Sequence, residues 1–452
     1  MILFKDYKEQ YRSNLRLAAP IMVSHAGQMA VQLADNVMVG RLGAAPLAGV
    51  ALGGTLFWAV FILCMGVTMG LTPLVGEMFA RGNHRTSAYF LQNSIVLYML
   101  IGILTLGVQF SLVPLMHHMG QPPEAVAQAV PYYKYLIWSV LPFMLFAAFK
   151  QFLEGLGQTK AIMIVVITAN CINVFFNYLL IYGKWGFPQM GAAGSGLATL
   201  ISRLAMPLLI ILFFVAKNRY RRYFSFFSWA GFHLGKTLSL LKVGMPIAMQ
   251  MFMENGAFVV TAIMMGWIGT AALAANQIGI VIANFSFMMV IGISSATTIR
   301  VSHEYGSGNL RRMKMAADSS YHIAMLWNTF IAMVFIVFRN YIPRLFTDDP
   351  QVLEIASMLM IFVAAFQLSD GLQAVSIGIL RGLQDVKSIM KIAFVSYLVV
   401  NLPIGYFCAF VLGWGPGGLW VGYIFGITMA AVLLITRFRW LYRKLLEKGE
   451  HY

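Results

Sequence analysis

The sequence predicts an all-α polytopic membrane protein with twelve transmembrane helices. We expect two six-helix lobes, related by a pseudo-twofold axis along the membrane normal. Hydrophobic residues make up 60% of the 452-residue chain and charged residues only 11%, whereas soluble domains carry about 25% charged residues. The apolar runs suit helices of about 20 residues rather than the short alternating strands of a transmembrane barrel. The two halves of the chain also repeat one another.

Twelve apolar runs are expected to form the transmembrane helices. They cover residues 15–39, 46–75, 88–112, 129–153, 160–182, 191–216, 241–267, 272–299, 316–338, 352–379, 388–412 and 417–437. The basic segment that follows, RFRWLYRKLLEKGEHY, is expected to form a short helix on the membrane surface. The predicted domains are an N-terminal lobe (1–216), a cytoplasmic linker (217–240), a C-terminal lobe (241–437) and a basic cytoplasmic tail (438–452).

The net charge of +16 comes from basic residues that gather in alternate loops. Positive charge in short loops marks the cytoplasmic side of a membrane protein, so the charge does not indicate a nucleic-acid partner. Of the 32 basic residues, 26 fall on one side of the predicted membrane, and the exceptions are Arg41, Lys134, Lys184, Arg203, Arg339 and Arg344. This split predicts that both termini are cytoplasmic, which requires an even number of spans.

An internal repeat relates the two halves of the chain at an offset of 226 or 227 residues. The matched pairs include Pro20 and Pro246, Gly66 and Gly292, Gly82 and Gly308, Asn83 and Asn309, and Gly155 and Gly382. Because each half has an even number of spans, both halves enter the membrane in the same direction. Parallel repeats of this kind place substrate and ion sites near the membrane midplane.

Three isolated carboxylates within apolar spans mark the candidate functional region. Glu254 is the only charged residue between Lys242 and Arg300, and Asp35 and Asp370 are isolated in the same way. A charge near the bilayer centre costs roughly 2.5 to 3.5 kcal/mol on insertion scales, so such residues usually belong to an ion or substrate pathway. The alternative interpretation is that they cap a helix break or pair within the bundle.

These carboxylates are not repeated between the halves. Asp35 aligns with Thr261, and Glu254 aligns with Gln28. The scaffold residues therefore repeat while the charged residues do not. This pattern indicates a shared frame in which each half has a different role.

Amide and hydroxyl side chains accompany Asp35 in the first half. Asn170, Asn173 and Asn177 share one face of the span 160–182, and Thr199 lies in the next span. A carboxylate with several amide oxygens can hold Na⁺, which prefers oxygen ligands, or can belong to a carboxyl that takes up a proton. The alternative role for these amides is hydrogen bonding between membrane helices.

A second polar group is predicted in the second half. Gln367, Asp370 and Gln373 form a stripe on the span 352–379. The aromatic residues expected to surround it are Phe252, Phe258, Phe285, Phe287 and Phe366. Carboxylates among aromatic faces suit organic cations, through charge pairing and cation–π contact. The predicted substrate-binding residues are Glu254, Gln277, Phe287, Phe366, Gln367 and Asp370. Glu254 and Asp370 are also a second candidate site for Na⁺ or for a proton.

No catalytic constellation emerges from the sequence. We find no phosphate-binding glycine loop, no His/Cys cluster with metal-ligand spacing and no nucleophile elbow. We therefore expect neither an enzyme nor a bound cofactor. An ion gradient rather than ATP is the expected source of energy.

Several segments together resemble the multidrug and toxic compound extrusion (MATE) family, in particular its NorM-like bacterial branch. They are QLADNVMVGRLG in the first span, EGLGQTK after the fourth, NVFFNYLLIYG and MGAAGSGLAT around the fifth and sixth, MENGAF in the seventh and LSDGLQAVSIGILRG in the tenth. The resemblance covers essentially the whole chain. It implies a monomeric, two-lobed antiporter of the bacterial inner membrane that exports cationic, amphipathic drugs, antibiotics and dyes in exchange for Na⁺ or H⁺.

The resemblance also implies roles for individual residues. Asp35, Asn173, Asn177 and Thr199 correspond to the cation and proton network of the N-terminal lobe, and Glu254 and Asp370 correspond to the acidic pair of the C-terminal lobe. Phe366 departs from the pattern, because some relatives have a tyrosine there. The missing hydroxyl weakens the expectation of a Na⁺ site at that place, although not of a carboxyl that accepts a proton.

The main alternative function is a lipid-linked oligosaccharide flippase of the same superfamily. Such a protein is expected to line its cavity with basic residues that meet phosphates. Here the isolated charges within the spans are acidic, and Arg203 is the only basic residue well inside a span. A membrane-embedded enzyme would need a catalytic constellation, which the sequence does not contain.

Overall fold

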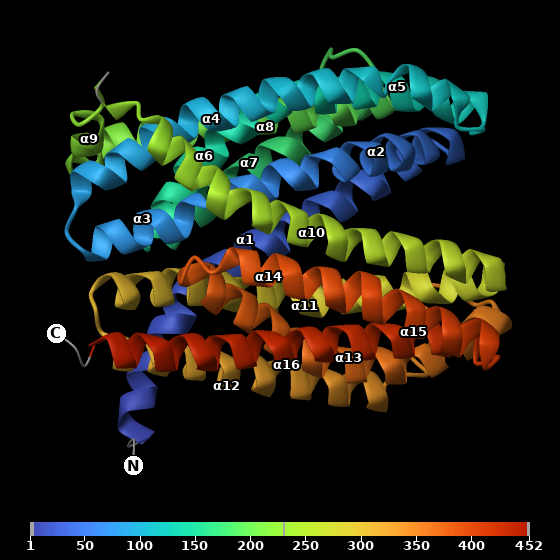
Figure 1. The fold of residues 1–452 in the computed structure, drawn as a ribbon. Helices are drawn as coiled ribbons and strands as arrows, with labels where there is room; N and C mark the ends of the chain where they lie inside the picture. The colour runs from blue at the N-terminus through green and yellow to red at the C-terminus, as the bar shows by residue number, and fades with distance from the viewer. Residues whose placement is uncertain (1–3, 229–230, 450–452) are drawn as a thin grey trace. The chain divides into compact units, whose positions relative to one another are not determined.

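The computed structural model describes residues 4–228 and 231–449, which form helices joined by turns and loops and contain no β-strand (Figure 1). A helix satisfies its own backbone N–H and C=O groups, which is what a chain needs inside a membrane. Eleven helical stretches in the described part are long and apolar enough to cross a membrane. The predicted all-α class is confirmed.

The first predicted span, 15–39, is not among these eleven stretches. It lies within the continuous helix α1 (Phe4–Gly40). Its apolar sequence is interrupted by polar residues at short intervals, which are Ser24, His25, Gln28, Gln32, Asp35 and Asn36. The helix is therefore present as predicted, but it is much less apolar than the other spans.

Contacts between the helices divide the described chain into two compact units. Val23–Ala248 form the N unit, and the described residues before and after that range form the C unit. The two cuts fall within α1 and α10 (Leu234–Ile268), and they lie 226 residues apart, which is the repeat offset. Each of these two long helices therefore contributes its first turns to one unit and its remaining turns to the other. The predicted division at a linker over 217–240 stays a prediction.

The N unit contains six predicted spans built from more than six helices. Its elements after α1 are α2 (Ala44–Thr68), α3 (Leu71–Ala80), α4 (His84–Ser111), η1 (Pro114–His118), α5 (Pro123–Trp138), α6 (Val140–Gly155), α7 (Thr159–Tyr182), α8 (Ala192–Ala216) and α9 (Asn218–Phe224). The predicted spans 46–75 and 129–153 are each divided, at Gly70 and Ser139 respectively. The helix α9 lies in the segment that was expected to be a linker.

The C unit has longer uninterrupted helices. After α10 its elements are α11 (Thr270–Gly306), α12 (Leu310–Val337), η3 (Pro343–Leu345), α13 (Pro350–Gly382), α14 (Val386–Ala393), η4 (Phe394–Asn401), α15 (Leu402–Tyr406), η5 (Phe407–Val411) and α16 (Gly415–Gly449). Both η4 and η5 are π-helices, so the predicted span 388–412 is not a regular α-helix. In this unit α13 packs against α11, α12 and α16, as Figure 1 also shows.

The repeat found in the sequence has a structural counterpart at the starts of α4 and α12. Asn83 and Asn309 are the N-cap residues of these helices, and each side chain accepts a hydrogen bond of 3.0 Å from a backbone N–H three residues later. The preceding residues, Gly82 and Gly308, have φ angles of 73° and 75°. Glycine adopts this left-handed conformation without steric cost, which explains why both residues are repeated.

The repeat also recurs where α6 and α13 end. A Cβ at Gly155 would lie 2.8 Å from the Cβ of Val75, and a Cβ at Gly382 would lie 2.8 Å from the Cβ of Val301. Val75 and Val301 are themselves 226 residues apart in the sequence. Small residues let membrane helices approach closely, so both units use the same close contact.

The basic segment at the C-terminal end differs from its prediction. We expected a separate short helix on the membrane surface, but residues 438–449 continue α16 without a break. No glycine or proline interrupts the chain between Gly426 and Gly449, so nothing in the local sequence ends the helix earlier.

Candidate functional site

Asp35 lies at one end of a chain of hydrogen bonds in the N unit. Its carboxyl accepts a hydrogen bond from Nδ2 of Asn177, which also donates to Oδ1 of Asn173 at 2.9 Å. Nδ2 of Asn173 in turn donates to Oγ1 of Thr199 at 3.4 Å. Asn173 and Asn177 are one turn apart on α7, and α8 packs against α7 and supplies Thr199. The structure brings these four predicted residues together.

The amide side chains of this chain are buried. Asn177 is fully buried and Asn173 is 4% exposed. Oδ1 of Asn177 has no hydrogen-bond partner within the described residues, although a buried polar atom without a partner costs about 1 to 3 kcal/mol. This oxygen is therefore a spare acceptor beside the Asp35 carboxyl.

Asn170 does not join the chain, although it lies on the same face of α7. Its buried Nδ2 has no partner within the part of the chain that the structure describes. A Cβ at Gly27 of α1 would lie 3.1 Å from that nitrogen, so α1 passes close to it. Asn170 therefore lies next to the site without contributing a hydrogen bond to it.

The oxygen atoms around Asp35 form a suitable donor set for an alkali cation. They are the carboxyl of Asp35, Oδ1 of Asn173 and Asn177 and Oγ1 of Thr199. Among the described residues no three His, Cys, Asp or Glu side chains gather into a metal-binding group. A cation at this place would therefore be held by one carboxylate together with neutral oxygens, which suits a hard cation such as Na⁺.

Glu254 is the centre of a second network, in the C unit. One carboxyl oxygen accepts a hydrogen bond of 2.6 Å from Nε2 of Gln250, one turn earlier on α10. The other oxygen accepts a hydrogen bond of 2.8 Å from the hydroxyl of Tyr397. Tyr397 belongs to the π-helix η4, and π-helical turns are frequent at functional sites.

Two residues of α13 extend this network on either side. Nε2 of Gln373 donates to the hydroxyl of Tyr397 at 2.5 Å, and Nη2 of Arg381 donates to Oε1 of Gln250 at 2.8 Å. Glu254 therefore lies in a continuous series of side chains from α10, α13 and η4. Arg381 is thus connected to Glu254 through Gln250.

Asp370, also on α13, lies beside this network. It is 4% exposed, and its carboxyl lies within electrostatic range of both Glu254 and Tyr397. Glu254 and Asp370 interact electrostatically as an acidic pair, so the state of one carboxyl affects the other. The structure thus brings together the two acidic residues that the sequence predicts.

The other predicted substrate-binding residues lie elsewhere in the C unit. Gln367 is fully buried and donates to the backbone oxygen of Ala283 at 3.2 Å, so it connects α13 to α11. Phe366 is 5% exposed and packs in the apolar core against Trp420. The predicted role of both side chains in binding substrate stays a prediction.

The remaining two predicted residues are on α11. Gln277 is exposed and Phe287 is half-buried. Neither has a hydrogen bond or ring contact to Glu254 or Asp370 within the described residues. Their predicted role in binding substrate stays a prediction.

Sequence reasoning missed three members of the Glu254 network. Gln250 could have been found, because it lies four residues before Glu254 on the same helix. Arg381 is recognisable as a charged residue, but its contact with Gln250 could not be predicted because the two residues are far apart in the sequence. The contact of Tyr397 could not be predicted, because the side chain is positioned by a π-helix. Nothing in the apolar sequence FVSYLVVN distinguishes a π-helix from an α-helix.

Arg203, the one basic residue predicted well inside a span, is enclosed by aromatic rings. Its guanidinium lies 5.1 to 5.3 Å from the ring centroids of Phe57, Phe61 and Phe143. Nη1 also donates to Oγ of Ser139 at 2.9 Å. Cation–π contacts are most favourable when the cation is removed from water. The guanidinium of Arg203 is therefore stabilised by side chains of the N unit itself.

Comparison with known proteins identifies the family. The MatE family model matches residues 20–179 and 246–407, which include most of both halves of the chain. The chain belongs to the MatE family. The two matched ranges begin 226 residues apart, at the repeat offset found in the sequence. The predicted resemblance is confirmed.

Relatives in this family match nearly the whole chain. The probable multidrug resistance protein NorM of Idiomarina loihiensis is 32% identical over 449 residues, which cover 98% of this chain and 96% of that protein. The multidrug resistance protein MdtK of Yersinia pseudotuberculosis is 31% identical over 459 residues, which cover 99% of this chain and all of that protein. This MatE protein therefore extends over the same length as these NorM and MdtK proteins.

Solved structures share the fold of this MatE protein. The eukaryotic MATE transporter AtDTX14 superimposes with a TM-score of 0.86 at 18% identity, and covers 98% of this chain and 99% of that one. The predicted fold, twelve helices in two six-helix lobes, is confirmed. The chain is an integral membrane protein of a transporter family rather than a member of an enzyme family.

Proposed function

We propose that this chain is a secondary active multidrug efflux transporter. It exports cationic, amphipathic compounds in exchange for Na⁺ or H⁺, by alternating access. The observation that carries the proposal is the pair of partly buried networks in which Asp35 and Glu254 receive hydrogen bonds from neutral side chains. Isolated carboxyls in membrane helices are costly to keep and usually serve ion or substrate pathways. The names of the NorM and MdtK relatives support multidrug compounds as the substrates.

The Asp35 network is proposed as one site for the coupling ion. Na⁺ would use the Asp35 carboxyl with the amide and hydroxyl oxygens around it, whereas H⁺ would bind the carboxyl itself. In either case the positive charge compensates the carboxyl, and the hydrogen bond from Asn177 would change in strength. That change would affect the contacts between α1, α7 and α8, because these helices carry the interacting side chains.

Glu254 and Asp370 are proposed to attract the cationic substrate in the C unit and to release it when the coupling ion binds. The two carboxyls form one acidic pair, so compensation of either charge weakens the attraction for an organic cation. We further propose that the protein acts as a monomer in the bacterial inner membrane, with both termini cytoplasmic. The distribution of 26 of its 32 basic residues supports that orientation.

The alternative function, a lipid-linked oligosaccharide flippase, requires cationic groups available to phosphates. Arg203 is the basic residue within the membrane spans that was considered for such a role. Its guanidinium already contacts three phenylalanine rings and Ser139. This arrangement favours the efflux transporter over the flippase.

A binding measurement on the purified protein separates the two functions. We expect a fluorescent organic cation to bind and a soluble lipid pyrophosphate analogue not to compete with it. In Glu254→Gln and Asp370→Asn, affinity for the cation should fall about tenfold, or about 1.4 kcal/mol, because each removes one negative charge. Tight binding of the pyrophosphate analogue would favour the flippase. Unchanged cation affinity and unchanged coupled efflux in both variants would remove the proposed role of the acidic pair.

A further inference from the structure

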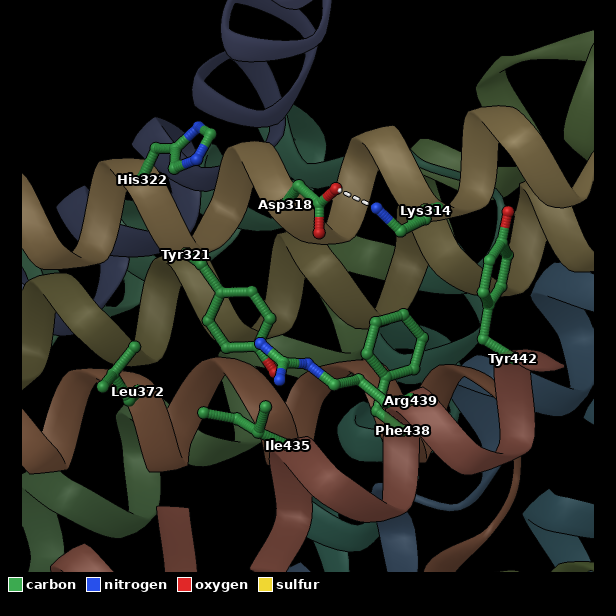
Figure 2. Close-up of a pocket in the computed structure, with 9 residues that line it drawn as sticks. All are labelled: Lys314, Asp318, Tyr321, His322, Leu372, Ile435, Phe438, Arg439 and Tyr442. Atoms are coloured by element: carbon green, nitrogen blue, oxygen red, sulfur yellow. Dashed lines mark hydrogen bonds and ion pairs between the residues drawn. The ribbon is translucent and has the colours of Figure 1, made fainter. Parts of the chain in front are cut away.

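A pocket of about 310 Å³ lies in the C unit, and none of its lining residues belongs to the Glu254 network (Figure 2). It is formed by the first turns of α12, the last turns of α16 and one residue of α13. Polar lining residues include Lys314, Tyr321 and Arg439, and apolar ones include Leu372 and Ile435. Nothing in the proposed transport mechanism uses these side chains.

The pocket has an excess of positive charge. Arg439 is exposed, and it has no ion-pair partner among the residues that the structure describes. In Figure 2 its guanidinium extends across the pocket toward Tyr321. Lys314 contributes a second cation, whose amine lies 2.9 Å from Oδ2 of Asp318.

The acidic residue of the pocket is already engaged. The carboxyl of Asp318 accepts from Lys314, and its Oδ2 also accepts a hydrogen bond of 3.4 Å from the hydroxyl of Tyr7 on α1. His322 also lines the pocket, and its Nδ1 lies 2.9 Å from the hydroxyl of Tyr11. The charge that faces the pocket without compensation is therefore that of Arg439.

The lining changes from polar to apolar along the helix axes. On α16, Ile435, Phe438, Arg439 and Tyr442 share one face, and Ile435 and Tyr442 are about 10 Å apart along the axis at 1.5 Å per residue. Tyr442 lies nearer the end of α16, whereas Ile435 lies deeper in the span, opposite Leu372 (Figure 2). A ligand that fits this gradient has an anionic head group and an apolar chain.

The corresponding place in the N unit provides an internal comparison. A second pocket there is lined by Gln92, Ile95 and Val96 of α4, which are 226 residues before Asp318, Tyr321 and His322. No charged side chain lines it within the described residues. Nε2 of Gln92 also donates to the backbone oxygen of Ser228 at 2.8 Å, so the chain itself covers that surface. The repeated scaffold therefore forms a pocket in both units, and the charge is particular to the C unit.

We propose that the pocket of the C unit binds the phosphate head group of an anionic membrane lipid. Arg439 and Lys314 hold the phosphate, Tyr321 and Tyr442 border the head group, and Leu372 and Ile435 contact the first part of an acyl chain. Basic pockets between membrane helices are suited to anionic head groups, and arginine matches the geometry of phosphate oxygens. This inference rests on the membrane location of the chain and not on the proposed transport function.

The test uses the full-length protein in detergent with added short-chain phosphatidylglycerol. Its apparent Kd is obtained from the rise in the midpoint of thermal unfolding, because a ligand that binds only the folded state stabilises it. We expect Arg439→Gln to weaken this binding about fivefold, the value that corresponds to about 1 kcal/mol per basic residue at a membrane surface. Arg439→Lys keeps the charge and should retain most of the affinity.

The matched control is Arg443→Gln, which removes the same charge from an exposed position on the same helix that does not line the pocket. It should change the apparent Kd by less than about twofold. Equal weakening in Arg439→Gln and Arg443→Gln would overturn the proposal, as would equally tight binding of phosphatidylcholine. If inorganic phosphate alone gave the same stabilisation with the same dependence on Arg439, the lipid assignment would be wrong and the site would be one for free phosphate.

Discussion

The Asp35 and Glu254 networks surround a partly buried carboxyl with different kinds of side chain. Asp35 has neutral amide partners on α7, and its chain of hydrogen bonds ends at a threonine hydroxyl on α8. Glu254 accepts from a tyrosine and a glutamine, and the series ends at an arginine. The first network presents mainly oxygens that could serve a small ion. The second presents an acidic pair next to a fixed cation, which suits exchange of one positive charge for another.

The repeat explains how one scaffold supports both arrangements. The close contact at Gly155 recurs at Gly382, and Arg381 occupies the place of Glu154 at the offset of 227. Tyr397 likewise occupies the place of Asn170. The charges at equivalent positions therefore differ in sign or type. The two units share repeated helix caps and close contacts, but they differ in chemistry and also in local backbone, since Asn170 lies in the α-helix α7 and Tyr397 in the π-helix η4.

The largest expected effect is that of Asp35→Asn. Asparagine keeps the shape of the side chain but cannot carry the negative charge that a coupling ion compensates. We expect gradient-driven dye efflux from proteoliposomes to fall to the level of protein-free liposomes. The neighbouring Asn36 is exposed, so Asn36→Ala is the control and should retain activity within about twofold. Coupled efflux by Asp35→Asn at the wild-type rate would show that Asp35 in the N unit does not couple ion movement to dye efflux.

Asn177→Ala is expected to have the next largest effect. It removes the donor to Asp35 and one acceptor for an ion, and a hydrogen bond to a charged group is worth about 1.5 to 3 kcal/mol. Coupled efflux should therefore fall about tenfold or more. Asn170→Ala is the matched control, because its buried Nδ2 makes no hydrogen bond to the described residues. If both variants lost activity equally, the hydrogen-bonded chain would not explain the role of α7.

Tyr397→Phe tests the C unit with a smaller change. It removes the donor to Glu254 and the acceptor for Gln373 while keeping the aromatic ring. The loss of one hydrogen bond is worth about 1 kcal/mol, so affinity for an organic cation should change about fivefold. Tyr406→Phe, in the same span and exposed, should bind the cation as the wild type does. Identical affinities in both variants would exclude Tyr397 from the site.

The smallest expected effect concerns the shared scaffold. Asn83→Ala and Asn309→Ala each remove an N-cap hydrogen bond of the same length. Each should lower stability by about 1 kcal/mol, measured by unfolding in detergent, without changing the ion dependence of efflux. An effect several times larger in one variant would mean that the two units do not use the repeated cap in the same way.

The fold class and most of the N-unit network could be predicted from the sequence. Asp35 is an isolated charge, and Asn173 and Asn177 are one turn apart, so both signals are local. The stripe of Gln367, Asp370 and Gln373 was less informative, because residues on one helix face can serve different neighbours. Gln367 bonds to α11 and Gln373 to Tyr397 of η4. Those partners depend on how the helices pack, which polarity along one helix does not specify.

The role of Asp35 and Glu254 in coupling is best decided by efflux of a fluorescent cationic dye from proteoliposomes with a Na⁺ gradient or a proton gradient imposed alone. We expect efflux driven by at least one of the gradients, and loss of that efflux in both Asp35→Asn and Glu254→Gln. Absence of efflux under either gradient, or efflux that persists in both variants, would contradict this role.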